Sequence, residues 1–327
     1  MTTPILGTSG THAQLLEFVA SAASSDAEVL IQGPSGVGKE LYARRIHELS
    51  ARAQAAFVPV NCGALPADLF ENELFGHAHG AFTGARTRSN GLAAEAHQGT
   101  LFLDEIDSLP LASQVKLLRF IQLKEYRPLG DPRLRHSDAR IIAATNADLV
   151  TAVREGRFRA DLFFRLRVLP LVVPPLRERR EDIPALLEHF LRRYAAEYGK
   201  PPVSFSRQAL QHLYAYDWPG NIRELENCVR YLLCTRSGGT VHPEELPLLS
   251  HLEQETAAAS PPESAAALHQ ETFQSAKRRV VSAFERQYLQ RTLQAHHGNI
   301  AAAARASGKH RRAFFELMRR HGLTREQ

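Results

Sequence analysis

Short apolar runs alternate with helix-periodic segments over residues 28–175. Four of the runs are EVLIQG, FVPVN, TLFLDE and ARIIAATN, and amphipathic segments such as LASQVKLLRFIQ lie between them. Apolar runs of this kind are typical of strands that are buried on both faces. The alternation therefore predicts an α/β fold in which helices cover both faces of a mostly parallel sheet.

The pattern changes after the prolines of VVPPL. Residues 181–249 carry only helical periodicity, which predicts a smaller helical subdomain. The stretch EQETAAASPPESAAALHQ has no periodicity and is typical of a linker, and a final helical unit follows it. We expect four parts: an α/β subdomain over 1–175, a helical lid over 176–249, a linker over 250–269 and an all-α domain over 270–327.

Composition narrows the class of protein. A chain of 327 residues with 44% hydrophobic content has room for two or three domains with cores of their own. No apolar run approaches the roughly 20 residues that cross a bilayer, and MTTPILGTSG lacks the basic and apolar regions of a secretion signal. We expect a cytoplasmic protein without membrane contact. Its three cysteines, Cys62, Cys228 and Cys234, match neither a zinc pattern nor a redox pair, which predicts structural thiols.

Positive charge is concentrated at the end of the chain. The whole sequence carries a net charge of +5, but residues 291–327 contain eight Lys or Arg against two Glu, so the preceding residues carry −1. A basic tail on an otherwise neutral chain indicates a nucleic-acid contact in the tail.

A glycine-rich segment, GPSGVGKE, lies between the first strand and a helix. A phosphate-binding loop requires this context, because glycines let successive amides point at phosphate oxygens and the helix amino terminus adds a favourable dipole. Lys39 would bring a positive charge to the β- and γ-phosphates, whereas Glu40 stands where the generic motif has Ser or Thr. An ordinary glycine-rich turn is the alternative. The predicted nucleotide-binding residues are Gly33, Pro34, Ser35, Gly36, Val37, Gly38, Lys39 and Glu40.

The strand GTLFLDEID supplies the second half of the predicted site. Asp104 can hold magnesium directly or through water, and Glu105 can orient and deprotonate the attacking water. An acidic pair after an apolar strand, downstream of a phosphate loop, predicts an ATPase that uses ATP and Mg²⁺.

The segment ELFGHAHGAFTGARTRSNG places Phe82 among glycines and other small residues. Glycines at both flanks favour a mobile loop, which is a poor place to bury a ring. Either Phe82 folds back as an anchor, as aromatic residues usually do, or it is presented to a partner. Local sequence leaves both alternatives open.

The order of these segments resembles one known family. Together with VNCGAL, ATN, FRADLFFRL, PPLRERREDI and WPGNIREL, they occur as in bacterial sigma-54-dependent transcriptional activators, the enhancer-binding proteins of the AAA+ class. The resemblance runs from about Leu6 to Leu246, and GAFTGA is highly specific to the family. Glu40 is what the family carries after its phosphate-loop lysine.

The resemblance implies further roles in the ATPase site. Asn61 is similar to a switch asparagine that holds Glu105 away from the water, although a strand-end asparagine that bonds backbone is the alternative. Asn146 resembles a first sensor of the γ-phosphate, and Arg223 resembles a second sensor carried by the lid. Arg159 and Arg165, six apart on one expected helix, resemble arginines projected into a neighbouring subunit's site.

These roles imply a ring and a partner. Arginines that act on the neighbouring subunit require a closed ring, most simply a homo-hexamer, or a hetero-oligomer with a related activator. The resemblance also implies that the tip of the glycine-flanked loop contacts the sigma-54 subunit of RNA polymerase and helps to remodel the closed promoter complex. This contact is assigned to Gly80, Ala81, Phe82, Thr83, Gly84 and Ala85.

The basic tail is similar to the Fis-type helix-turn-helix domain of these activators. A Gly298-Asn299 break, a small-residue helix from Ile300 and a turn at Gly308 precede a basic amphipathic helix. Phe314, Leu317 and Met318 are expected to face the core of the domain. Contacts with enhancer DNA are expected from Lys309, His310, Arg311, Arg312, Arg319 and Arg320.

Two other classes of protein share part of this pattern. Another AAA+ remodelling ATPase with a DNA-binding module would share the phosphate site but has no use for GAFTGA, and a DNA-binding repressor with a decayed ATPase would not need to keep Lys39, Asp104 and Glu105. Because the phosphate loop begins by residue 33, we expect no sensory domain before it and regulation by a separate protein or by expression level.

Overall fold

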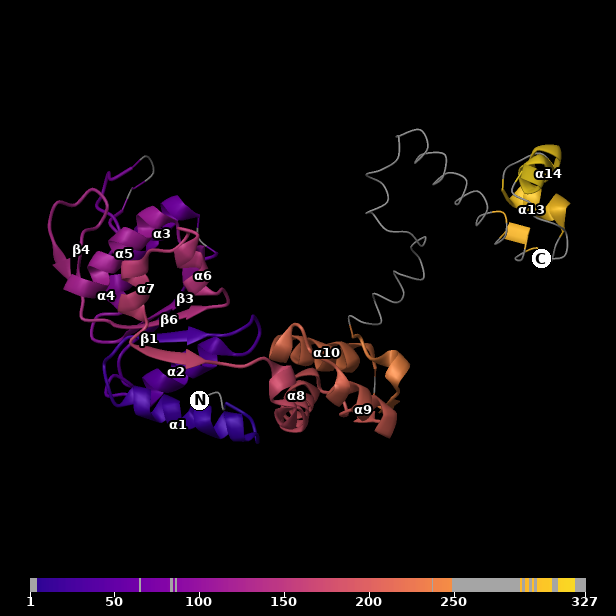
Figure 1. The fold of residues 1–327 in the computed structure, drawn as a ribbon, viewed down its shortest axis with the longest axis horizontal. Coiled ribbons are helices and arrows are strands. Elements are labelled where there is room, and N and C mark those ends of the chain that lie inside the picture. The colour runs from indigo at the N-terminus through magenta and orange to yellow at the C-terminus, as the bar shows by residue number, and fades with distance from the viewer. Residues whose placement is uncertain are drawn as a thin grey trace. The chain divides into compact units, whose positions relative to one another are not determined.

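The computed structural model describes two parts of the chain. They are residues 5–248, apart from 65, 83, 84, 86 and 237, and in the C-terminal part residues 289, 292, 293, 296, 299–307 and 311–320. The chain divides into two compact units, Met1–Leu246 and Pro247–Gln327, and each is described by itself (Figure 1). The expected linker, 250–269, lies outside the described residues, and the four expected domain boundaries stay predictions. In the described part of the chain, every helix is too short or too polar to cross a lipid bilayer.

A five-stranded parallel sheet forms the centre of the first unit. The strand order is β2-β3-β6-β1-β7, and every pair of neighbours is parallel. The four apolar runs in the sequence become four of these strands, and β7 adds an edge. The bounds are β1 Val29–Gln32, β2 Phe57–Asn61, β3 Thr100–Asp104, β6 Arg140–Thr145 and β7 Leu169–Val172.

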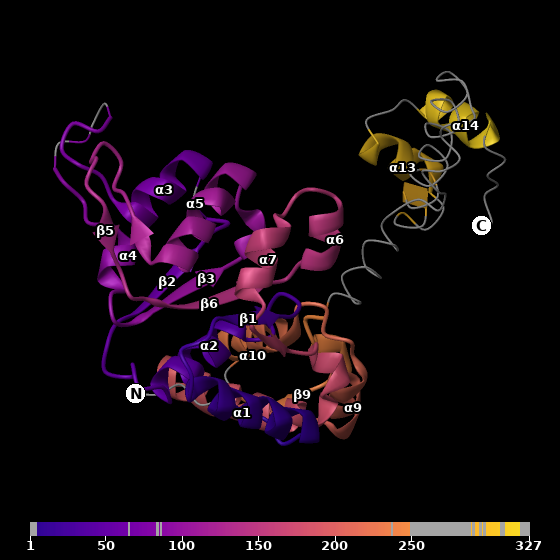
Figure 2. The ribbon, with the colours of Figure 1, turned by 60° about the vertical axis from the view of Figure 1, so that its left-hand side comes forward.

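Helices cover both faces of this sheet (Figure 2). Alternate residues of each inner strand point to opposite faces, so Leu101 and Leu103 join one apolar cluster while Phe102 joins the other. The first cluster packs under α3, α5 and α7, and the second under α1 and α2. The bounds are α1 Gly10–Ala23, α2 Lys39–Glu48, α3 Ala67–Phe75, α4 Leu92–Glu95, α5 Leu111–Leu123, α6 Leu149–Arg154 and α7 Ala160–Leu166, with η1 at Ile106–Ser108.

The lid follows the sheet within the same unit. Two short 3-10 turns, η2 Leu176–Glu178 and η3 Arg180–Asp182, lead into α8 Ile183–Tyr198, α9 Arg207–Ala215 and α10 Asn221–Thr235, and η4 Pro243–Glu245 comes last. The expectation of helix alone was wrong, because β8 Ser204–Phe205 and β9 Thr240–Val241 pair in parallel. Strands of two residues are too short to produce an alternating pattern.

A small hairpin stands beside the loop that carries Phe82. It consists of β4 Glu125–Tyr126 and β5 Arg135–His136, which pair antiparallel. In the second unit, α13 Ile300–Ala306 and α14 Arg311–Arg320 are described. Phe314 and Met318 are buried and Leu317 is partly buried in one apolar cluster, which confirms the expected core of the domain.

Candidate functional site

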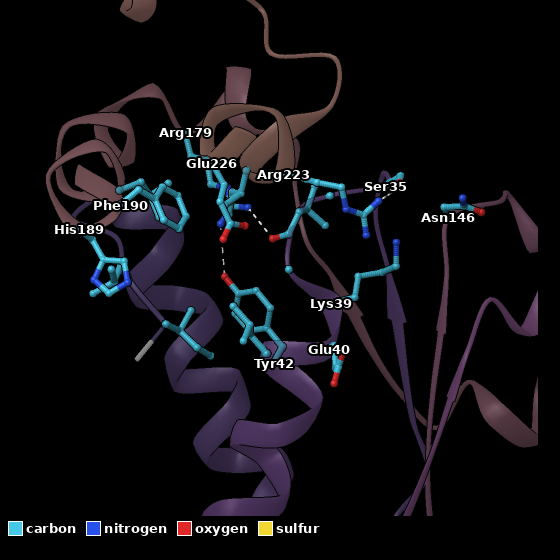
Figure 3. A pocket seen from close by; sticks show the side chains of 18 of the residues that line it. Ser35, Lys39, Glu40, Tyr42, Asn146, Arg179, His189, Phe190, Arg223 and Glu226 are labelled. Carbon is cyan, nitrogen blue, oxygen red and sulfur yellow. Dashed lines mark hydrogen bonds between the residues drawn. The ribbon is translucent and has the colours of Figure 1, made fainter. Parts of the chain in front are cut away.

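A pocket of about 370 Å³ lies between the sheet and the lid. It is lined by the phosphate loop, by residues at the carboxyl ends of β3 and β6, by the first described residues of the chain and by α8 and α10. Figure 3 places Ser35, Lys39 and Asn146 toward one end of the pocket and His189 and Phe190 toward the other. The pocket therefore has a polar end that suits phosphates and a second end with an aromatic side chain.

The predicted phosphate loop connects β1 to α2. Gly36 and Gly38 have φ angles of +77° and +94°, in the left-handed region that favours glycine. A Cβ on Gly36 would lie 2.3 Å from the carbonyl oxygen of Gly220, so no larger residue fits there. Because α2 begins at Lys39, the first amides of this helix have no partner within the helix and are free for a ligand at the loop.

The lysine of the loop lies across the loop itself. Its Nζ donates to the carbonyl oxygens of Gly33 and Pro34, at 2.8 and 3.1 Å. Burial lowers the pKa of Lys39, while the nearby carboxylate of Asp104 acts in the opposite direction. Glu40 also lines the pocket, and its carboxylate forms an ion pair with Arg44 at 2.7 Å, one turn along α2.

The predicted acidic residues lie at the same edge of the sheet as the phosphate loop. Asp104 ends β3 opposite Asn61 of β2, and both Asp104 and Glu105 line the pocket. The Asp104 Oδ1 accepts from the Glu105 amide at 2.9 Å, and Glu105 has a φ of +53°. A Cβ on Gly63 would lie 2.1 Å from Glu105 Oε2, so the carboxylate occupies space that only a glycine leaves open.

Asn61 bonds to backbone in this structure. Its Oδ1 accepts from the amides of Gly63 and Ala64, at 2.8 and 2.9 Å. This arrangement corresponds to the alternative in which a strand-end asparagine closes a turn. The turn nevertheless lies beside Glu105, since the position of a Gly63 Cβ would be 3.4 Å from Asn61 Oδ1.

The two expected sensors reach the pocket from opposite sides. Asn146 follows β6 and is an exposed residue that lines the pocket, while Arg223 is the third residue of α10, in its first turn. The Arg223 Nη1 donates to Ser35 Oγ at 3.1 Å, so the lid arginine already touches the phosphate loop.

The sequence did not predict several of the residues that line the pocket. Arg179 donates to the carbonyl oxygen of Val37 at 3.1 Å and to the hydroxyl of Tyr42 at 3.4 Å (Figure 3). Burial raises the pKa of the Tyr42 hydroxyl. The motif PPLRERREDI, which contains Arg179, could have pointed to this residue. The hydrogen-bond partners of Arg179, however, lie far from the motif in the sequence. The remaining unforeseen lining residues are Ile5, Leu6, Leu41, Leu186, His189, Phe190, Arg193, Ile222 and Glu226.

Arg159 and Arg165 lie away from the pocket of their own chain. Arg159 precedes the first turn of α7 and pairs with Asp161 at 2.7 Å, and Arg165 within α7 pairs with Glu28 at 3.3 Å. Neither arginine lines the pocket. The expectation that both lie on one helix is correct only for Arg165, because Arg159 has extended backbone angles.

The loop with Phe82 stands on a small backbone ladder. His77 pairs with Ser89 across the base of the loop, and the Gly80 amide donates to the carbonyl oxygen of Ala85 at 2.9 Å. The Phe82 side chain is 44% exposed and meets the His77 ring edge to face, with ring centroids 5.1 Å apart. Of the predicted partner-contact residues, Ala81 and Ala85 are described as half-buried and buried, whereas Thr83 and Gly84 lie outside the described residues.

Comparison with known families decides the identity. Residues 5–172, half of the chain, match the family described as the Sigma-54 interaction domain. The chain belongs to the sigma-54-dependent transcriptional activators. In this family member, residues 177–264 match an AAA+ ATPase lid domain and residues 280–320 match the Fis family of bacterial regulatory proteins, so the chain is a nucleotide-binding AAA+ ATPase with a Fis-type DNA-binding domain.

Individual relatives of this activator agree with the family match. The chain is 42% identical over 319 residues to the regulatory protein AtoC of Escherichia coli, covering 98% of this chain and 68% of that protein. It is 49% identical over 244 residues to the regulatory protein ZraR of Salmonella typhimurium, covering 75% of this chain and 55% of that protein. A crystal structure of NtrX from Brucella abortus with ADP has a TM-score of 0.76 at 34% identity, over 98% of this chain and 69% of that chain.

The described part of the Fis-type domain agrees with a helix-turn-helix. Helix α13 begins at Ile300, as expected, and the Asn299 Oδ1 accepts from the Ala302 amide at 3.2 Å and so caps it. Arg319 is exposed on α14, and Arg311, Arg312 and Arg320 belong to the same helix. The other two expected DNA contacts, Lys309 and His310, lie outside the described residues.

Proposed function

We propose that this activator binds enhancer DNA through its Fis-type domain, assembles into a ring, and couples ATP hydrolysis to remodelling of the sigma-54 RNA polymerase closed complex. The observation that carries the proposal is the pairing of a nucleotide pocket with a separate loop that presents a half-exposed Phe82. We also propose that the protein is cytoplasmic and that a separate protein regulates it.

The pocket suits ATP and magnesium by the chemistry of its side chains. Lys39 and Arg223 bring positive charge to the polar end, and Asp104 offers the oxygen ligands that Mg²⁺ prefers. When bound, Mg²⁺ neutralises charge on the β- and γ-phosphate oxygens. Glu105 is proposed to orient the attacking water and to accept its proton, with Asn146 placed to detect the γ-phosphate.

Asn61 is proposed to switch the position of Glu105. Its carbonyl oxygen bonds the Gly63 and Ala64 amides, so a rotation of the side chain would have to exchange those bonds for one to Glu105. The proximity of Glu105 to Gly63 supports this exchange, because the carboxylate already lies beside the turn that Asn61 closes.

Arg159 and Arg165 are proposed to complete the site of the neighbouring subunit. In their own chain Arg159 pairs with the exposed Asp161, and Arg165 pairs with the partly buried Glu28. Neither arginine lines the pocket of its own chain. A guanidinium that neutralises transition-state charge is worth about 10³ to 10⁵ in rate in other phosphoryl-transfer systems. This arrangement requires a ring, proposed as a homo-hexamer, or a mixed ring with a related activator.

The proposal is tested by ATP hydrolysis as a function of protein concentration, for the wild type, Arg159→Ala and the control Arg157→Ala. Arg157 is exposed and paired with Glu155, so it matches Arg159 in environment without a proposed role. We expect a steep concentration dependence in the wild type and control, lost in Arg159→Ala, together with sigma-54 trapped by a transition-state analogue of ATP. Hydrolysis that is flat in all three proteins, with no trapped sigma-54, would leave another kind of AAA+ remodelling ATPase with a DNA-binding module.

A further inference from the structure

Three consecutive carbonyl groups of the phosphate loop are held by residues from outside the loop. The Ser35 oxygen accepts from Asn221 Nδ2 at 2.9 Å. The Gly36 oxygen accepts from the amides of Ile222 and Arg223, at 3.0 and 3.3 Å. The Val37 oxygen accepts from Arg179 Nη2 at 3.1 Å, as described above.

This pattern determines where the loop amides point. In a trans peptide the carbonyl C=O and the next N–H lie in one plane and point in opposite directions. Holding the oxygens of Ser35, Gly36 and Val37 against the lid therefore turns the next three amides, those of residues 36–38, the other way. These residues line the pocket, so their amides are arranged for phosphate oxygens before any ligand arrives.

The buried side chain of Asn221 bonds to two segments outside its own helix. It is 2% exposed, and besides its bond to Ser35 its Oδ1 accepts from the Leu176 amide at 2.8 Å. One side chain thus links the phosphate loop, the connection that leaves the sheet and the start of α10. Its φ of +55° is an unusual conformation for any residue but glycine and asparagine, so the position is restricted by backbone as well as by contacts.

We infer that Asn221 is a positioning residue for nucleotide binding, because it makes the shape of the phosphate loop depend on the docked lid. The inference rests on the nucleotide pocket proposed above and adds a role that does not involve contact with the nucleotide. It differs from the role of Arg223, whose side chain faces the pocket. Loss of the Asn221 bridge weakens ADP and ATP equally, because the loop holds phosphates that both nucleotides share.

The test uses the full chain with two variants of Asn221. Asn221→Gly accepts the positive φ without strain but removes both bridges, while Asn221→Asp keeps an oxygen for Leu176 and sets a second oxygen against the Ser35 carbonyl. Binding of fluorescent ADP and of ATPγS is measured well below each melting temperature. For each variant we expect both dissociation constants to rise by about the same factor, roughly 10- to 100-fold in Asn221→Gly, which loses both bridging hydrogen bonds, with kcat at saturating ATP nearly unchanged.

Trp218→Phe is the matched control for general loosening of the same turn. Trp218 is fully buried and its Nε1 donates to the Leu213 carbonyl oxygen at 2.9 Å, within the lid alone. We expect this variant to melt earlier and to bind both probes normally. Asn221 variants that bind as the wild type does would overturn the inference, and so would a Trp218→Phe chain weakened as much as they are. If the wild-type chain binds neither probe, the assignment of the pocket to nucleotides is overturned together with the inference about Asn221.

Discussion

Replacing Phe82 by alanine should separate ATP hydrolysis from promoter opening. The ring lies on a loop whose base is closed by its own backbone bonds, and its one aromatic neighbour among the described residues is His77. His77 is fixed independently, since its ring nitrogens lie 2.6 Å from Asn72 Oδ1 and 2.9 Å from the Thr87 carbonyl oxygen. Loss of the Phe82 ring therefore leaves the loop base in place.

The cost in stability follows from exposure. Complete burial of a phenylalanine is worth about 1.5 to 3 kcal/mol, and Phe82 remains 44% exposed, so burial contributes about half of that. An aromatic pair adds about 0.5 to 1.5 kcal/mol when well packed. The substitution should thus cost about 1 to 3 kcal/mol, less than the roughly 5 to 15 kcal/mol of a typical domain.

The assay compares ATP turnover with open-complex formation at a sigma-54 promoter. We expect turnover of Phe82→Ala within about twofold of the wild type and open complexes reduced more than about 30-fold, as for an interface residue worth at least 2 kcal/mol. Phe82→Tyr should retain activity because it keeps the ring. Leu49→Ala removes a side chain that is 47% exposed on another surface and should change neither readout. Normal promoter opening by Phe82→Ala would refute the proposed contact.

Three further outcomes can be checked with purified protein. Mixing Arg159→Ala with Lys39→Ala subunits should restore ATP hydrolysis that each lacks alone, since each supplies what the other has lost; additive inactivity would contradict an arginine acting across subunits. In native protein at about pH 8, Cys234 should react with a thiol reagent while the other two cysteines react only after unfolding, because burial raises the pKa of the Cys228 thiol to about 12; three fast thiols would contradict this. Burial lowers the pKa of His47 below its ordinary value near 6.5, so the unfolded chain binds a proton more readily than the folded chain. The free energy of unfolding should therefore fall as pH drops below about 6.5. Denaturant titration of His47→Gln should show a smaller dependence on pH.

The sheet was predictable from sequence because its inner strands are apolar throughout. EVLIQG and TLFLDE became β1 and β3 with little change in bounds. The strand order was not predictable, since β1 lies between β6 and β7 and no local pattern records which strands become neighbours. Strand β7 contains Pro170, which is compatible with its position at the edge of the sheet.

The residues of the site were likewise predictable from the sequence only in part. Residues inside compact motifs, such as Lys39 and Asp104, were found from spacing and chemistry and do meet at one pocket. The sequence did not predict the roles of Arg179 and Asn221, because each role consists of a hydrogen bond to a backbone oxygen of the phosphate loop. That loop lies 142 residues from Arg179 and 186 residues from Asn221 along the chain. Such long-range bonds to backbone leave no periodicity or composition in the sequence, so only a three-dimensional structure reveals them.

Backbone hydrogen bonds join the Phe82 loop to the neighbouring hairpin. The Ala78 amide donates to the Leu129 carbonyl oxygen and the Leu129 amide donates to the Gly76 carbonyl oxygen, both at 2.9 Å. Any insertion that lengthens one segment between these bonds and its tip raises that tip relative to the other. The distance by which the Phe82 loop extends beyond the hairpin is therefore set by the difference in length between the two segments.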